Sequence, residues 1–83
     1  MSDQHKIEIL KILREDAVDG KAVRYSFNAL SKNIGLTKDE IDVYLTELLK
    51  ARFVGQYAKK GVDSFTVEIK PAGLDVVLDG SFN

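Results

Sequence analysis

Residues 26–50, SFNALSKNIGLTKDEIDVYLTELLK, contain two helix signals separated by a tight turn. Ser26 is placed to cap the first helix, because its short side chain can accept an unpaired N–H of the first turn. The apolar face of this helix holds Phe27, Leu30 and Ile34. Gly35 predicts its end, since glycine readily takes the left-handed conformation of a helix C-terminus. We therefore expect a helix of barely two turns, followed by a sharp turn into a second one.

The residues Thr37-Lys38-Asp39-Glu40 fit a capping box. In this motif Thr37 accepts a hydrogen bond from the N–H of the third helical residue, and Glu40 reaches back to the N–H of the cap. The second helix is therefore expected to begin directly after Thr37. Apolar residues follow at i, i+3, i+4 and i+7, a spacing that gives the helix one continuous buried side. This side consists of Ile41, Tyr44, Leu45, Leu48, Leu49 and Arg52.

Three short segments show the pattern of strands. The short segment 22–25, which contains the β-branched Val23 and the aromatic Tyr25, directly precedes Ser26. After Arg52 the hydrophobic period changes from about 3.6 to 2, which predicts strands at 53–58 and 64–69. The segment between them, 59–63, contains two lysines and a glycine, so we expect a hairpin with a basic tip.

Two further helices are expected at the ends of the chain. The first spans 3–18 and ends at Gly20, where glycine can take a positive φ. Its apolar residues spread far beyond the roughly 100° stripe of a surface helix, so neighbours must cover it on two sides. The second begins at Pro71, whose missing N–H costs nothing in a first helical turn, and ends near 79–80. Its apolar face holds Leu74, Val77 and Leu78.

Composition places the chain among ordinary soluble proteins. Of 83 residues, 45% are apolar and 30% charged, so we expect a single domain over residues 1–83. The chain has no Cys, which excludes disulfides and cysteine-bound zinc. No stretch suits a membrane span or a signal peptide, and we expect a cytoplasmic protein. Twelve Lys and Arg against thirteen Asp and Glu give a net charge of -1, which supplies no global attraction to a polyanion.

The expected order is helix, short strand, short helix, tight turn, longer helix, two-stranded hairpin and closing helix. This order resembles the winged helix-turn-helix superfamily, in particular its small prokaryotic, archaeal or viral regulators. The resemblance rests on segments 26–37, 51–54 and 70–74 and covers nearly the whole chain. It implies a mainly helical α+β fold in which the helix after Thr37 enters the DNA major groove. It also implies that the preceding helix crosses the backbone and that the hairpin, or wing, touches phosphates or the minor groove.

The outward face of the helix after Thr37 carries one lysine and three acids, a net charge of -2. Its residues are Asp39, Asp42, Val43, Thr46, Glu47 and Lys50. In a DNA reader the acids can accept from the cytosine amino group, while Thr46 and Lys50 contact bases. The alternative is a solvated helix face whose acids favour the positive end of the helix dipole and whose Glu47 pairs with its neighbours.

Lysines supply the other candidate DNA contacts. Lys59 and Lys60, expected at the hairpin tip, are long enough to reach phosphates on either side of a groove. The alternative is that they serve solubility and discourage pairing of an exposed strand. Lys38 lies beside a helix N-terminus, where phosphates bind readily. The candidate DNA-binding residues are therefore Lys38, Thr46, Lys50, Lys59 and Lys60.

The sequence favours no enzymatic chemistry. His5, the single histidine, is expected to be solvated in a frayed first turn, and no hydrolase, metalloprotease or nucleotide-binding motif occurs. The acids Glu15, Asp16 and Asp19 miss the EF-hand spacing and are interpreted as the end of a helix. The aromatic residues on faces expected to be buried are Tyr25, Tyr44, Phe53, Tyr57 and Phe65. We predict no enzyme activity, no metal and no cofactor.

These observations predict a transcriptional regulator that binds double-stranded DNA. The alternative, which the near-neutral charge favours, is a winged helix that binds another protein instead of DNA. We also expect a homodimer through the helix at 3–18 and the closing helix. Ile9 and Ile12 lie away from Leu10 and Leu13 on the first helix, and a closing helix of about two turns is expected to leave them uncovered. An isologous dimer would bury this surface and match an operator with two half-sites.

Overall fold

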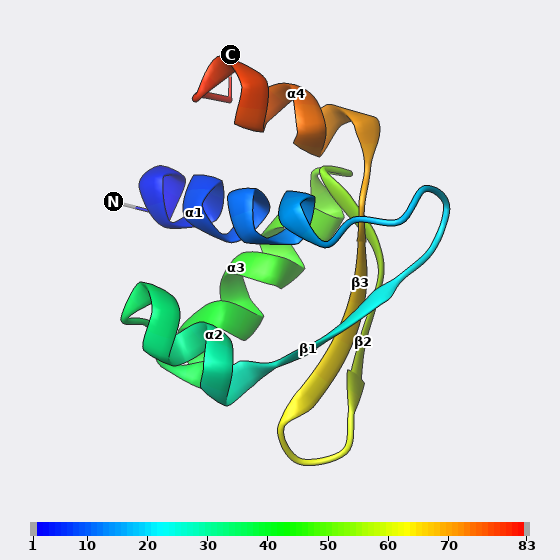
Figure 1. Ribbon diagram of the computed structural model, residues 1–83. Coiled ribbons are helices and arrows are strands. Elements are labelled where there is room, and N and C mark those ends of the chain that lie inside the picture. The colour runs from blue at the N-terminus through cyan, green and yellow to red at the C-terminus, as the bar shows by residue number, and fades with distance from the viewer. Residues whose placement is uncertain (1, 83) are drawn as a thin grey trace.

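The computed structural model describes residues 2–82 and has the predicted order of elements. The elements are α1 (Ser2–Glu15), β1 (Val23–Ser26), α2 (Phe27–Ile34), α3 (Lys38–Lys50), β2 (Val54–Lys60), β3 (Ser64–Ile69) and α4 (Pro71–Asp79). The strands form an antiparallel sheet in the order β1-β3-β2. The helices lie on one side of this sheet, which leaves its other face open (Figure 1). The chain is a small α+β protein.

The capping signals around α2 and α3 are confirmed. The Ser26 side chain accepts from the backbone N–H of Ala29, and Gly35 ends α2 with a φ of 72°. Thr37 and Glu40 form both hydrogen bonds of the capping box at the start of α3. The backbone N–H and the hydroxyl of Thr37 hold the pKa of Glu40 below its usual value. Local hydrogen bonds therefore fix the turn between the two helices.

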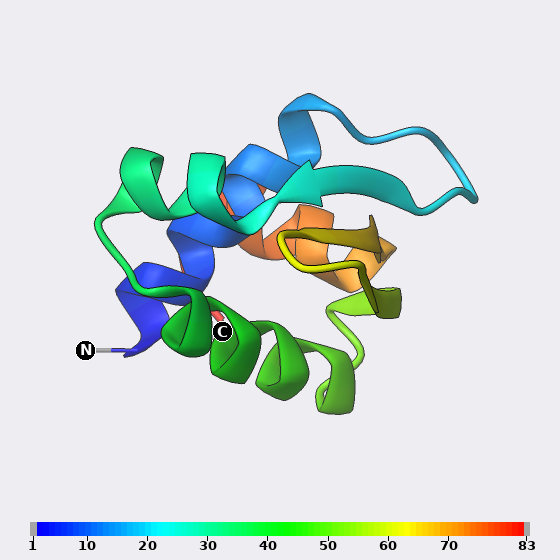
Figure 2. The ribbon, with the colours of Figure 1, turned by 90° about the horizontal axis from the view of Figure 1, so that it is seen from below.

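Helix α1 lies in the middle of the helical layer. It packs between α4 on one side and α2 and α3 on the other (Figures 1 and 2). Ile9, Leu10 and Leu13 are fully buried. Two-sided coverage of α1 is therefore confirmed, and a single chain provides it.

The burial of Ile9 corrects the expectation that this residue faces outward. Helix α4 packs along α1 within the same chain. Gly73, which has no side chain, lets α4 approach the backbone of Phe53 and the side chain of Ile69 closely. Gly73 and Val76 form the buried side of α4, whereas Leu78 is 71% exposed and not part of the apolar contact expected for it. A helix of nine residues therefore packs on α1 and is held close to the ends of β2 and β3.

Helix α1 ends at Glu15, earlier than expected. The Tyr25 hydroxyl donates to the carbonyl of Leu13 at 3.2 Å, and Ala17 N–H bonds to the carbonyl of Arg14, which tightens the last turn. Gly20 has the expected positive φ of 73°, but it lies in a separate turn closed by a bridge between Val18 and Lys21. The acids of this segment oppose the negative end of the helix dipole, which favours the early end.

The far end of α3 also departs from the expected pattern. Leu49 and Arg52 are exposed rather than buried. The helix ends at Lys50, and Arg52 takes a positive φ of 66° on the way into β2. Beyond Lys50 the helical period therefore no longer decides where Arg52 points, while Leu49 lies outside the buried side of α3 in its last turn.

A β-bulge in β2 decides where the hairpin side chains point. Gly55 pairs with Glu68 and Ala58 with Thr66, so two residues of β2 lie opposite the single residue between them on β3. Gln56, within the bulge, has a φ of 54°. A bulge shifts the in-and-out alternation of a strand by one residue. Beyond it, Lys59 lies on the side of the buried Phe65 and of α3, and Lys60 lies on the open face with Ser64.

The bounds of β2 correct the expected position of the two lysines. Strand β2 extends through Lys60, because Lys59 pairs with Phe65 and Lys60 with Ser64. The loop of the hairpin consists of residues 61–63 alone. Lys59 and Lys60 are therefore held on opposite faces of a paired strand rather than in a loose tip.

Replacing Gly73 with alanine tests the close approach of α4. Alanine normally stabilises a helix interior by about 0.5–1 kcal/mol relative to glycine. Here the added Cβ would overlap the backbone oxygen of Phe53, so we expect Gly73→Ala to lower the free energy of unfolding by about 1–3 kcal/mol. Gly55→Ala is the matched control, because the only atom that its Cβ would overlap belongs to the flexible end of Lys70. Urea unfolding of both variants checks this, and an equal effect would contradict it.

Candidate nucleic-acid interface

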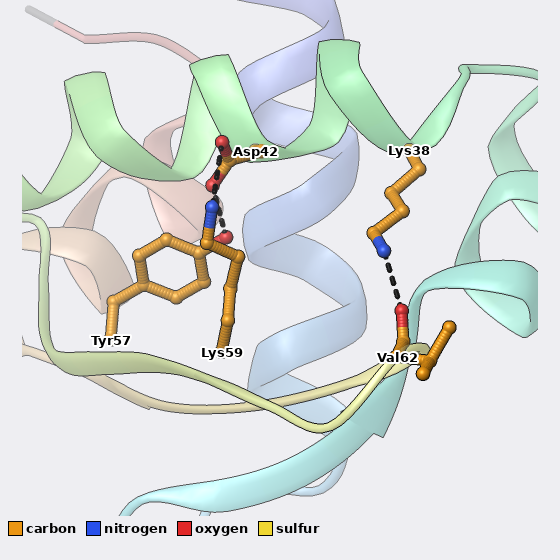
Figure 3. A network of polar contacts seen from close by, with 5 residues as sticks. All are labelled: Lys38, Asp42, Tyr57, Lys59 and Val62. Atoms are coloured by element: carbon orange, nitrogen blue, oxygen red, sulfur yellow. Dashed lines mark hydrogen bonds and ion pairs between the residues drawn. The ribbon is translucent and has the colours of Figure 1, made fainter.

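Asp42 on α3 connects this helix to the β2–β3 hairpin. Its carboxylate accepts a hydrogen bond of 2.6 Å from the Tyr57 hydroxyl and lies 3.5 Å from the Lys59 ammonium (Figure 3). Both partners point toward α3 because the bulge at Gln56 precedes them. The outward acid of α3 thus holds the hairpin in a defined position beside the helix.

The loop of the hairpin is attached to the start of α3. The Lys38 ammonium donates to the backbone carbonyl of Val62 (Figure 3). It also lies 5.3 Å from the centre of the Phe27 ring, within the range of a cation–π interaction. Lys38 is therefore an exposed lysine that binds other groups of the protein, although the sequence suggested a phosphate contact.

Asp63 attaches the same loop to the start of α2. Its carboxylate accepts from the Ser26 hydroxyl and, at 3.0 Å, from the N–H of Asn28, while its carbonyl accepts from the N–H of Phe27 at 2.7 Å. A carboxylate is favourable here because the N-terminus of a helix carries partial positive charge. Sequence reasoning missed Asp63, since its partners lie more than thirty positions away and no local motif links them.

Neighbouring elements compensate two of the three acids on the outward face of α3. Glu47 forms an ion pair of 2.7 Å with Lys6 of α1, rather than with a neighbour on its own helix as the alternative expected. Asp42 is paired with Lys59. When Lys6 and Lys59 are included, the face that sums to -2 in sequence becomes neutral. Asp39 and Lys50 remain as exposed charges of opposite sign.

The five predicted DNA-binding residues occupy three different situations. Lys38 and Lys59 are bound to other groups of the protein. Thr46 is half-buried and Lys50 exposed on α3. Lys60 is exposed on the open face of the sheet. The structure thus gathers α3 and the hairpin into one unit, with Lys50 and Lys60 as its outward cations.

The other candidate groups take structural roles. His5 is half-buried rather than solvated, because α1 begins before it and its ring lies 3.3 Å from the Tyr44 hydroxyl.

Among residues 2–82, no three His, Asp or Glu side chains gather as a metal site. None of the helices in that range is long and apolar enough to cross a membrane. A shallow hollow of about 220 Å³ lies on α3 beside Asp39, Glu40, Val43 and Tyr44.

Comparison of the chain with protein-family models, with curated proteins and with solved structures gives no significant match.

The two tyrosines that tie elements together predict a loss of stability at high pH. Burial, and secondly the charge of Asp16, raises the pKa of Tyr25 from 10.0 to about 12. Burial, followed by the hydrogen bond to Asp42, also raises the pKa of Tyr57. A raised pKa means that the folded state favours the neutral phenol over the charged phenolate. The contribution of each tyrosine to the free energy of unfolding is therefore complete below pH 10 and is lost as the pH rises above 10.

We expect the free energy of unfolding to decrease as the pH rises from about 10 to 12, and to decrease less steeply in Tyr57→Phe. Urea unfolding at several pH values measures both slopes. All other groups are the same in both proteins, so the difference between the two slopes reports Tyr57. Parallel slopes would contradict the assigned role of its hydroxyl.

Proposed function

We propose that this protein is a winged-helix domain that binds double-stranded DNA through α3 and the β2–β3 hairpin, as a small transcriptional regulator. The observation that carries the proposal is the fixed position of the hairpin. Asp42 holds its strand beside α3, while Lys38 and Asp63 hold its loop at the starts of α3 and α2. The helix and the hairpin are therefore fixed relative to each other, which suits joint contact with a duplex.

The proposed binding mode assigns different roles to α3 and the hairpin. An α-helix fits the major groove, and the outward position of Thr46 and Lys50 on α3 suits contact with base edges. Lys60 on the open side of the hairpin suits a phosphate contact. Pairing of Glu47 and Asp42 within the protein supports this mode, because it removes the excess negative charge that would repel phosphates.

The second candidate function is binding of a protein partner in place of DNA. The neutral charge of the α3 surface favours it, since attraction to DNA depends mainly on cations that neutralise phosphates. A duplex-binding experiment at low salt separates the two functions. Absence of binding there would favour the protein partner.

Salt dependence of duplex binding tests the hairpin contact. Each phosphate contact contributes about 0.9 to the slope of log K against log salt concentration. We expect Lys60→Ala to weaken binding to every duplex and to lower this slope by about 1. Lys21→Ala is the matched control, because Lys21 is an exposed lysine in the turn at the opposite end of the sheet (Figure 1). Fluorescence anisotropy over a salt series measures both slopes.

An unchanged slope in Lys60→Ala would remove the hairpin from the binding mode. An equal decrease in Lys21→Ala would show that net charge, rather than the hairpin, accounts for the effect. Lys59→Ala is less informative than Lys60→Ala, because it also breaks the ion pair with Asp42.

We also propose a homodimer through α1 and α4. Of the two isoleucines that suggested this dimer, Ile9 is buried within the chain and Ile12 is half-buried against the core, so the exposed apolar group left for the contact is Leu78 on α4. We expect sedimentation equilibrium to give twice the chain mass, and Leu78→Glu to give the monomer while staying folded, since Leu78 contributes little to the core. A wild-type protein that sediments as a monomer at high micromolar concentration would contradict the dimer.

A further inference from the structure

Four residues form one line along the outward side of α3. Asp39, Val43, Thr46 and Lys50 follow one another at i, i+4, i+7 and i+11, the spacing of residues on one face of a helix. With a rise of 1.5 Å per residue the line is about 16 Å long, close to the length of five base pairs at about 3.4 Å each. We call these four residues the α3 line.

The other polar groups on the outward side of α3 are occupied within the protein. The carboxylate of Asp42 accepts from Tyr57 and Lys59. The carboxylate of Glu47 is paired with Lys6 at 2.7 Å. These acids are therefore unsuited to accept from the amino group of a cytosine. The α3 line is the part of this surface that stays available to a groove.

Val43 is the apolar member of the α3 line. Its side chain is 51% exposed, between the polar Asp39 and Thr46 on the same face. Beside it lies the hollow of about 220 Å³, whose other walls are Asp39, Glu40 and Tyr44. An exposed aliphatic side chain with open space beside it can receive a small apolar group.

We propose that Val43 is a specificity-determining residue that packs against the 5-methyl group of a thymine in the major groove. This inference rests on the DNA binding proposed above. The thymine methyl is the apolar feature that a normal base pair presents in the major groove, and aliphatic side chains contact it. The other residues of the α3 line carry a carboxylate, a hydroxyl and an ammonium group. These groups suit the hydrogen-bonding edges of neighbouring bases.

Replacement of thymine by uracil tests the contact, because it removes the methyl group and leaves base pairing intact. A duplex is first selected with the wild-type protein from a random library, and each of its thymines is then replaced in turn. We expect one replacement to weaken wild-type binding about fourfold, as loss of one buried methyl group requires. Val43→Ala should bind the thymine and uracil duplexes equally at that position.

Two variants serve as controls. Val18→Ala removes the same atoms from a valine that is also 51% exposed but lies in the turn after α1, so it should keep the wild-type sensitivity to uracil. Val43→Thr keeps the shape of the side chain and replaces a methyl group by a hydroxyl, so it should show a reduced sensitivity.

The outcomes separate this inference from the proposed function. Failure to bind any duplex would overturn both. Binding without a preferred sequence, or with no thymine that is sensitive to uracil, would overturn the role of Val43 and leave DNA binding intact. If Val43→Ala is as sensitive as the wild-type protein to replacement of thymine by uracil, the role of Val43 is likewise overturned and DNA binding is left intact.

Discussion

The carboxylate of Asp42 is the point at which the two halves of the candidate interface meet. One oxygen accepts from Tyr57 and the other faces Lys59, so a residue of α3 fixes the position of the neighbouring hairpin. This arrangement depends on the bulge at Gln56, without which the alternation of β2 would turn both partners toward the open face. The bulge therefore decides that the hairpin is bound to α3 through Asp42.

Local pairing changes how the charges of this protein can act. A chain with a net charge of -1 has no overall attraction to a polyanion, so binding to DNA has to depend on where individual charges lie. Lys6 comes from α1 and Lys59 from β2, and each neutralises an acid of α3. Surface ion pairs of this kind contribute little to stability. Their effect here is to remove negative charge from the face that is proposed to meet the phosphates.

Close packing around α1 leaves few large apolar side chains on the surface. Gly73 allows α4 to approach, and α1 is buried from both sides within one chain. Among the described residues, the large apolar side chains that stay exposed are Val18, Val43, Leu49, Val62 and Leu78. They lie on different elements. Val43 differs from the others because it lies in the middle of a polar helix face.

Sequence alone determined the elements of this protein, because their signals are local. Ser26, Gly35 and the capping box at Thr37 act through hydrogen bonds and dihedral angles within four residues, and the structure has each of them as predicted. Periodicity likewise placed Leu10 and Leu13 of α1, and Ile41, Leu45 and Leu48 of α3, in the core. The tertiary structure decided which charged groups stay available, because Lys38, Lys59 and Glu47 find their partners on other elements. It also decided the facing of the hairpin and the burial of Ile9, since a bulge and a close helix approach depend on neighbours that are distant in the chain.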